Sequence, residues 1–198
     1  MPSLILGDFE PVLVRSLSEL PGILLVHAKS LCQEVFSELC RESWVWQEDV
    51  SIALTDGVSL YDLTPVQANT QVIGVVKVLD SGGLPLDKDV HYRITSGNQL
   101  ELLSDSITGP LLVCCIIQPT PAFVGIPEDL QDKYTAQLII GVKARAMLEV
   151  EKQWSSPQMG MNYQDKWERL LLATHSNVKE GFTVTRQGRP HSPRSFYY

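Results

Sequence analysis

The sequence predicts an α+β fold: a helical bundle of three main helices, with an inserted small antiparallel β-domain and an extended C-terminal arm. Three observations predict it. Apolar and polar residues alternate in short runs from Glu48 to Gln118, apolar residues recur at helical spacing on both sides of that stretch, and glycine, proline and arginine mark residues 182–198. The expected parts are 1–47, lead-in and first helix; 48–119, β-domain; 120–181, two helices that pack on the first; and 182–198, the arm.

Composition favours a soluble folded protein, since 44% of the 198 residues are apolar and the mean hydropathy is +0.01. The net charge of −7 argues against a general nucleic-acid binder, because such proteins neutralise phosphates with lysine and arginine. A surface that lets DNA pass without binding would also be acidic.

Four cysteines form no C-x-x-C pair and no Cys/His spacing typical of zinc, so Cys32, Cys40, Cys114 and Cys115 are interpreted as reduced structural thiols. The first residues lack the basic region of a signal peptide, and no apolar run approaches the ~20 residues of a membrane span. We therefore expect a protein made in the cytoplasm, with no membrane partner.

The first helix is expected from Pro21 to about Glu42, because apolar residues repeat there at helical spacing. Residues up to Leu20 are interpreted as an extended lead-in, although 11–17 would also suit a short strand or a helical turn. Trp44 and Trp46 follow the helix, and we expect them to pack the joint to the β-domain; stacking on a ligand is the alternative.

Six short strands are expected in the β-domain, which favours a small sandwich or barrel. A hairpin is predicted at Ser96-Gly97-Asn98, and the continuous apolar run Val72 to Leu79 is interpreted as a buried strand. The other runs are Val50–Leu54, Val58–Leu63, Tyr92–Ile94, Leu100–Leu102 and Leu111–Ile117.

After a proline-rich connector, a second helix is expected from Pro127 to about Trp154. Its apolar residues lie on more than one side, so we expect it to contact both its own domain and another subunit. The candidates for packing between subunits are Ile139, Ile140, Gly141 and Ala144.

A third helix is expected after the break at Ser155-Ser156-Pro157, with Asn162 and Asp165 in a capping arrangement and Gly181 as its end. Residues 182–198 then hold three arginines and no acid, whereas the preceding residues, with 13 bases and 23 acids, carry −10. A solvated, disordered tail is one interpretation. An arm that orders on a partner is the other, because arginines and aromatics anchor interfaces. Its candidate contact residues are Phe182, Arg186, Arg189, Arg194, Phe196, Tyr197 and Tyr198.

No catalytic constellation is recognisable. The histidines, His27, His91, His175 and His191, have no local partner at metal-ligand spacing, and the glycines and most aspartates fall at turns. We therefore predict no catalytic residue, no metal and no cofactor, and not an enzyme.

Several stretches resemble one family. They are Asp8-Phe9-Glu10-Pro11; the helix Ala28–Arg41 with its Trp-x-Trp ending at Trp44 and Trp46; Asp56–Leu63; Ile126–Leu130 with Tyr134, Gly141, Ala144 and Arg145; and Trp154–Pro157 with Tyr163. Together they are similar to the head-to-tail adaptor proteins of tailed bacteriophages, the group that includes tail tubular protein A. Leu39-Cys40 departs from the commoner Phe-Cys pair.

The resemblance implies a structural virion protein at the head-tail junction. Such adaptors form a ring, commonly of twelve copies, that joins the portal protein to a tail or nozzle protein and continues the DNA channel for genome ejection. DNA is expected to pass without specific binding, and the arm is expected to reach the portal or a neighbouring copy. Another tail-completion or stopper ring protein, or an unidentified cytoplasmic enzyme, is the alternative.

Overall fold

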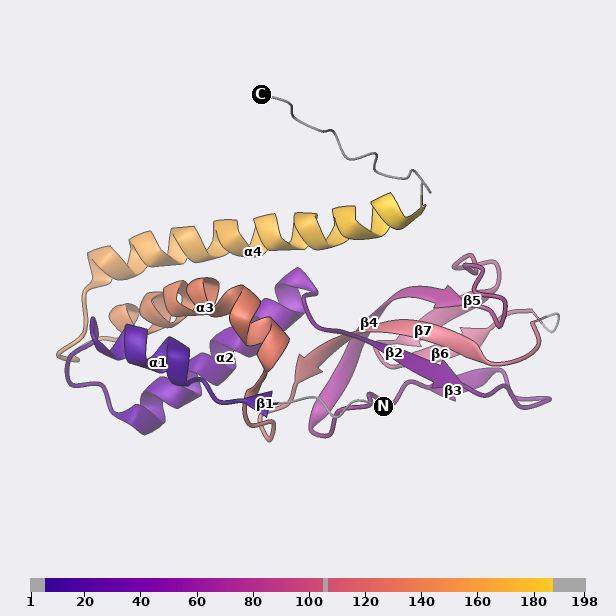
Figure 1. Ribbon diagram of the computed structural model, residues 1–198, viewed down its shortest axis with the longest axis horizontal. Coiled ribbons are helices and arrows are strands. Elements are labelled where there is room, and N and C mark those ends of the chain that lie inside the picture. The colour runs from indigo at the N-terminus through magenta and orange to yellow at the C-terminus, as the bar shows by residue number, and fades with distance from the viewer. Residues whose placement is uncertain (1–5, 105–106, 187–198) are drawn as a thin grey trace, which may run out of the picture.

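The molecule is elongated, with a helical domain at one end and a β-domain at the other (Figure 1). The structure is a computed structural model that describes residues 6–104 and 107–186. Its helices are α1 (Glu10–Leu17), α2 (Leu25–Ser43), α3 (Glu128–Leu148) and α4 (Pro157–Arg186). The β-domain is inserted between α2 and α3, so the predicted α+β class is confirmed, with four helices in the described residues in place of the three expected.

The β-domain consists of two three-stranded antiparallel sheets that share one apolar core. The predicted hairpin is confirmed, because the strands on either side of residues 97–98 pair in antiparallel register. One sheet has the order β2-β7-β4, from Gln47–Ile52, Leu111–Pro119 and Thr70–Leu79; the other has the order β3-β6-β5, from Leu60–Asp62, Gln99–Leu102 and Tyr92–Ser96. Two short strands, β1 (Leu6–Gly7) and β8 (Ile126–Pro127), pair beside α3.

The prediction of a strand from Val72 to Leu79 is confirmed by β4, but the prediction that this strand is buried is wrong, because the most buried strand is β7. β7 lies between β2 and β4, and its Val113, Cys115 and Ile117 are fully buried. β4 is at the edge of the sheet, is mostly half-buried and carries two register shifts. Continuous β-branched residues are equally compatible with both positions, so apolar content alone misplaced the centre of the sheet.

The lead-in is not extended, because residues 10–17 form α1. Pro11 occupies its first turn, and Asp8 Oδ1 accepts a hydrogen bond from the Glu10 N–H at 2.9 Å. One face of this short helix buries Val12 and Leu13 in the core. Tertiary packing therefore makes helical a segment too short to be recognised by periodicity.

The turn between α3 and α4 also differs from expectation. α3 ends at Leu148 and not near Trp154, because Glu149 turns out of the helix; its carboxylate accepts the Trp154 indole N–H at 3.1 Å and pairs with His27 at 2.5 Å. α4 begins at Pro157 and not at Asn162, since proline suits the first turn of a helix.

α4 does not stop at Gly181 but continues to Arg186, so the first five residues of the expected extended arm are helical. The rest of the predicted arm, residues 187–198, lies outside the described residues.

α3 is covered by helices of its own chain. It contacts α1, α2 and α4, and Gly141 lies where a Cβ would collide with Val35 of α2 and approach the Trp167 ring of α4 to 3.2 Å. Ala144 is fully buried, Ile139 belongs to the core, and Ile140 packs against it. Close packing of four helices within the chain therefore explains the several apolar sides of α3, and a contact of these residues with another subunit stays a prediction.

The aromatic joint packs as expected. Trp46 is buried between Phe36 and Phe123, with ring centroids 5.9 and 5.3 Å away. Trp44 ends α2 in the left-handed conformation, at φ 56°, and its ring meets His175 of α4 edge-on at 4.4 Å. The two tryptophans therefore fix both the β-domain and α4 to the end of α2.

Candidate functional site

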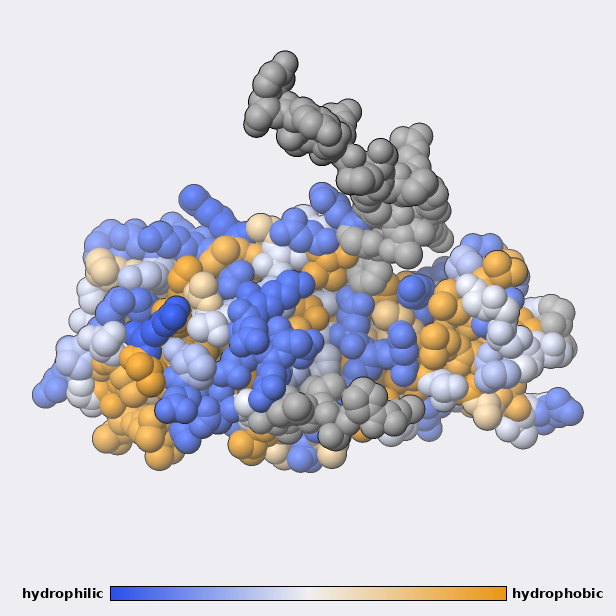
Figure 2. All heavy atoms as spheres, viewed as in Figure 1, coloured by the Kyte–Doolittle hydropathy of each residue, from blue (hydrophilic) through white to orange (hydrophobic). Residues whose placement is uncertain are grey.

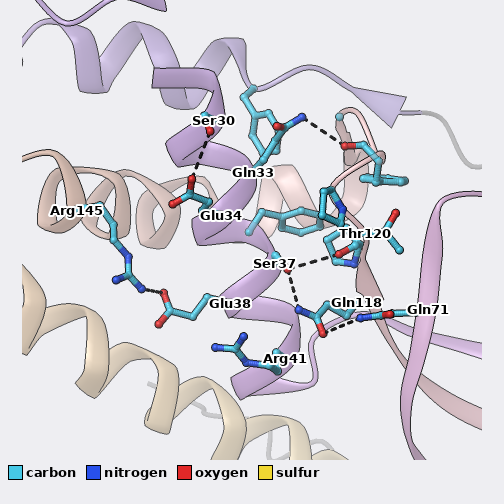
Figure 3. Close-up of a pocket in the computed structure, with 16 residues that line it drawn as sticks. Ser30, Gln33, Glu34, Ser37, Glu38, Arg41, Gln71, Gln118, Thr120 and Arg145 are labelled. Carbon is cyan, nitrogen blue, oxygen red and sulfur yellow. Dashed lines mark hydrogen bonds and ion pairs between the residues drawn. The ribbon is translucent and has the colours of Figure 1, made fainter. Parts of the chain in front are cut away.

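An open groove of about 610 Å³ lies between α2 and the connector that follows β7 (Figure 3). One wall is the outward face of α2, and the other is formed by residues 118–125 and Gln71. Edges of Phe9, Phe36 and Phe123 line it, although each of these side chains is largely buried. The groove therefore lies at the junction of the helical domain and the β-domain.

The connector wall is held to α2 by hydrogen bonds between uncharged groups. The Gln33 side-chain amide donates to the Phe123 carbonyl at 3.3 Å, and the Gln118 amide donates to Ser37 Oγ at 2.9 Å. Gln71 in turn donates to Gln118 at 3.4 Å, and these side chains point toward one another in Figure 3. The proline-rich connector is thus given a fixed path along α2, which makes the groove a preformed feature.

One side of the groove contains a carboxylate shared by three helices. Glu38 of α2 accepts a hydrogen bond from Arg145 of α3 at 2.6 Å and another from the indole N–H of Trp167 of α4 at 2.9 Å. The Glu38 side chain is 17% exposed and Arg145 is 40% exposed. Both donors bind the same oxygen, so the Glu38 carboxylate holds the three helices together.

The two ends of the groove differ in charge. Glu34 is exposed and accepts a hydrogen bond from Ser30 at 3.3 Å, and no cation of the described residues forms an ion pair with it. Arg41 lies seven residues further along α2, about 10 Å along the helix axis, and pairs with Glu42 at 2.8 Å. The groove thus has an acidic end and a basic end on one helix face.

The cysteines are free and buried, as expected from their spacing. Burial raises the pKa of Cys32 and of Cys115 to about 12 and that of Cys114 to about 11, and it raises the pKa of Cys40 well above its usual value. A thiol with a raised pKa is a poor nucleophile, so these groups act as apolar packing.

Residues 6–104 and 107–186 contain no group of three or more His, Cys, Asp or Glu side chains that could hold a metal ion. Over the same residues, none of the helices combines the length and the apolar character that crossing a membrane requires.

Apolar side chains are exposed at the end of the helical domain remote from the β-domain. Leu24, Leu25 and Val26 at the start of α2 are 52–81% exposed, and Figure 2 shows hydrophobic residues gathered there. His27 next to them pairs with Glu149 of the α3–α4 turn, so this end is held in place.

Few of the site residues predicted from sequence meet in the structure. Phe182 and Arg186 lie in the last turns of α4, whereas Arg189, Arg194, Phe196, Tyr197 and Tyr198 lie outside the described residues. The groove residues Glu34, Glu38 and Arg41 were not predicted, because polar residues opposite the apolar stripe of a helix are expected to be solvated. The connector beside them gave no signal, since its path depends on tertiary contacts.

The sequence matches no protein-family model, and no curated protein matches it. What the fold and the groove define is an α+β protein with an inserted β-sandwich and a preformed groove where the two parts meet.

Proposed function

We propose that the chain is a structural virion protein, a ring adaptor that joins the portal to the tail and continues the DNA channel. The observation that carries the proposal is the arrangement of α4. It packs along α2 and α3 and then continues past Trp44 to Arg186 (Figure 1), and the residues that follow in the sequence, 187–198, are basic and aromatic. Such a projection suits a contact with another subunit or with the portal, since arginine and aromatic residues anchor interfaces.

Charge supports the same proposal. Residues 48–119 hold nine acids and three bases, so the β-domain carries most of the net charge of −7. An acidic conduit repels phosphate and lets DNA pass without binding. The segment after α4 has the opposite sign, which favours an attachment role that is separate from the channel.

A truncation that removes residues 187–198 tests the attachment role. The cut follows the last residue of α4, so the core is intact, and we expect unchanged helical circular dichroism together with loss of the chain from assembled particles. A control removes only the side chains, by Arg189→Ala and Arg194→Ala, and is expected to weaken incorporation in part. Normal incorporation of the truncated chain would contradict an attachment role for this segment.

A further inference from the structure

We propose that the groove between α2 and residues 118–125 binds an extended peptide segment of a partner protein, in which a basic and an acidic side chain are three residues apart. The inference goes beyond the ring adaptor proposed above and does not rest on it, because the site lies within a single copy of the chain. The segment is recognised by its two charges and by a polyproline II backbone.

The two charges at the ends of the groove keep hydrogen-bonding capacity that their neighbours do not use. Among the described residues, the Glu34 carboxylate receives one long hydrogen bond, from Ser30 at 3.3 Å, and no ion pair. Glu42 binds Arg41 through Nε at 2.8 Å, which leaves the two terminal amino groups of the guanidinium for another carboxylate. A basic group at Glu34 and an acidic group at Arg41 would therefore each gain a partner.

The spacing of these charges fits a polyproline II helix. Glu34 and Arg41 are seven residues apart on α2, so they lie on the same face and about 10 Å apart along the axis. A polyproline II chain has three residues per turn and rises about 3.1 Å per residue, so side chains three residues apart point to the same side, roughly 9 Å from each other. A β-strand would point them to opposite sides. A free amino acid, whose ammonium and carboxylate groups are attached to one carbon atom, cannot span the two ends.

The walls of the groove suit such a backbone. A polyproline II chain forms no internal hydrogen bonds, so its carbonyl groups are available to donors of the groove. The side-chain amides of Gln71 and Gln118 each have two N–H groups and use one within the wall, Gln71 to Gln118 at 3.4 Å and Gln118 to Ser37 at 2.9 Å (Figure 3). The edges of Phe36 and Phe123 also line the groove, and proline-rich ligands dock in aromatic-lined grooves.

Ordering costs are low on both sides of the contact. The connector wall is already fixed to α2 by the hydrogen bonds from Gln33 to Phe123 and from Gln118 to Ser37. A polyproline II peptide is largely preformed in solution. Because little conformational entropy is lost, a contact of modest area gives measurable affinity.

Binding of synthetic peptides to the isolated chain of 198 residues tests the inference. The probes are fluorescein-labelled peptides with Lys-Pro-Pro-Glu or Glu-Pro-Pro-Lys between alanine flanks, since a polyproline II ligand can lie in either direction. We expect at least one probe to raise fluorescence polarisation at low ionic strength and to bind more weakly as salt is added. Replacing either charged residue of the better probe by glutamine should weaken binding about fivefold. A third proline turns the two charges about 120° apart and should reduce binding to that of the uncharged peptide.

Protein variants locate the contact. Glu34→Gln should weaken the better probe about fivefold and leave unchanged the peptide in which glutamine replaces lysine. Arg41→Gln should act in the same way on the peptide in which glutamine replaces glutamate. The matched controls, Asp132→Asn on α3 and Arg169→Gln on α4, remove the same charges outside the groove and should not change binding. All four side chains are exposed, so thermal unfolding of each variant should match that of the unchanged chain.

The outcomes separate this inference from the proposed function. No binding of either probe overturns the inference. Binding that Glu34→Gln and Arg41→Gln leave unchanged overturns the groove as the site, and equal binding of the uncharged peptide overturns recognition by charge. Particles that lack the chain overturn the adaptor role alone, because the peptide assay uses the isolated chain.

Discussion

The indole N–H of Trp167 donates a hydrogen bond to Glu38 Oε2 at 2.9 Å, and the indole ring is fully buried. Arg145 donates to the same oxygen at 2.6 Å. A single carboxylate on α2 therefore ties α3 and α4 together at the side of the groove. The position of the groove wall thus depends on a polar contact inside the helical domain.

Removing that carboxylate should destabilise the chain more than neutralising it. Glu38→Ala leaves the buried Trp167 N–H without an acceptor, which costs about 2 kcal/mol. Glu38→Gln keeps an acceptor and should cost about 1 kcal/mol, since the ion pair with Arg145 is partly screened by solvent. Urea unfolding of both variants checks this, and equal losses would show that the indole hydrogen bond contributes nothing.

Gly141 should not tolerate alanine, although alanine normally stabilises a helix by about 1 kcal/mol over glycine. The new methyl group would meet Val35 and the Trp167 ring, so Gly141→Ala should destabilise by about 1–3 kcal/mol. Val35→Ala makes room for it, and the double variant should be more stable than the sum of the single losses predicts. Thermal unfolding of the four proteins measures this coupling, and simple additivity would contradict the close packing.

The fold should lose more stability when Lys143 loses its partner, Glu19, than when Lys143 loses its own charge. Its side chain is 9% exposed, and its Nζ lies 2.6 Å from Glu19 Oε2. Glu19→Gln leaves a buried ammonium without its carboxylate and should cost about 1–2 kcal/mol, reduced because Glu19 is half-exposed. Lys143→Met removes the charge, keeps the apolar stem and should cost less. The reverse order in chemical denaturation would contradict this account.

The raised pKa values of the buried thiols predict that the folded chain loses stability at alkaline pH. In the unfolded chain Cys32 and Cys115 ionise near 9.0, whereas in the folded chain their pKa is raised to about 12. Between those values the unfolded state binds fewer protons, so the free energy of unfolding falls as pH rises. Cys32→Ala should reduce the slope of unfolding free energy against pH between 9 and 11. An unchanged slope would mean that the Cys32 thiol does not contribute to it.

Replacing Trp44 by glycine should destabilise the chain less than replacing it by alanine. Its backbone is left-handed, a conformation that costs a residue with a Cβ roughly 1 kcal/mol. Both changes remove the contact with His175, but only glycine relieves the strain. Trp44→Gly should therefore be about 1 kcal/mol more stable than Trp44→Ala, and a less stable glycine variant would contradict the assigned conformation.

Most strands were predictable because alternation of apolar residues is a local signal, and the turn at 96–98 fixed one hairpin. α1 was not predictable, because a helix of eight residues is too short to show a clear period. It is helical because Val12 and Leu13 are buried in the core. Pro157 was interpreted as a helix break when it is the first residue of α4. The groove was not predictable because Glu34 and Arg41 become a site only when the connector lies beside them.

The most direct test of the adaptor role is cryo-electron microscopy of particles from the source of the sequence. The account predicts ring density between head and tail in which four helices and a β-sandwich repeat around the axis. Density at that junction that this fold cannot fill, or particles that lack the chain, would contradict the adaptor role.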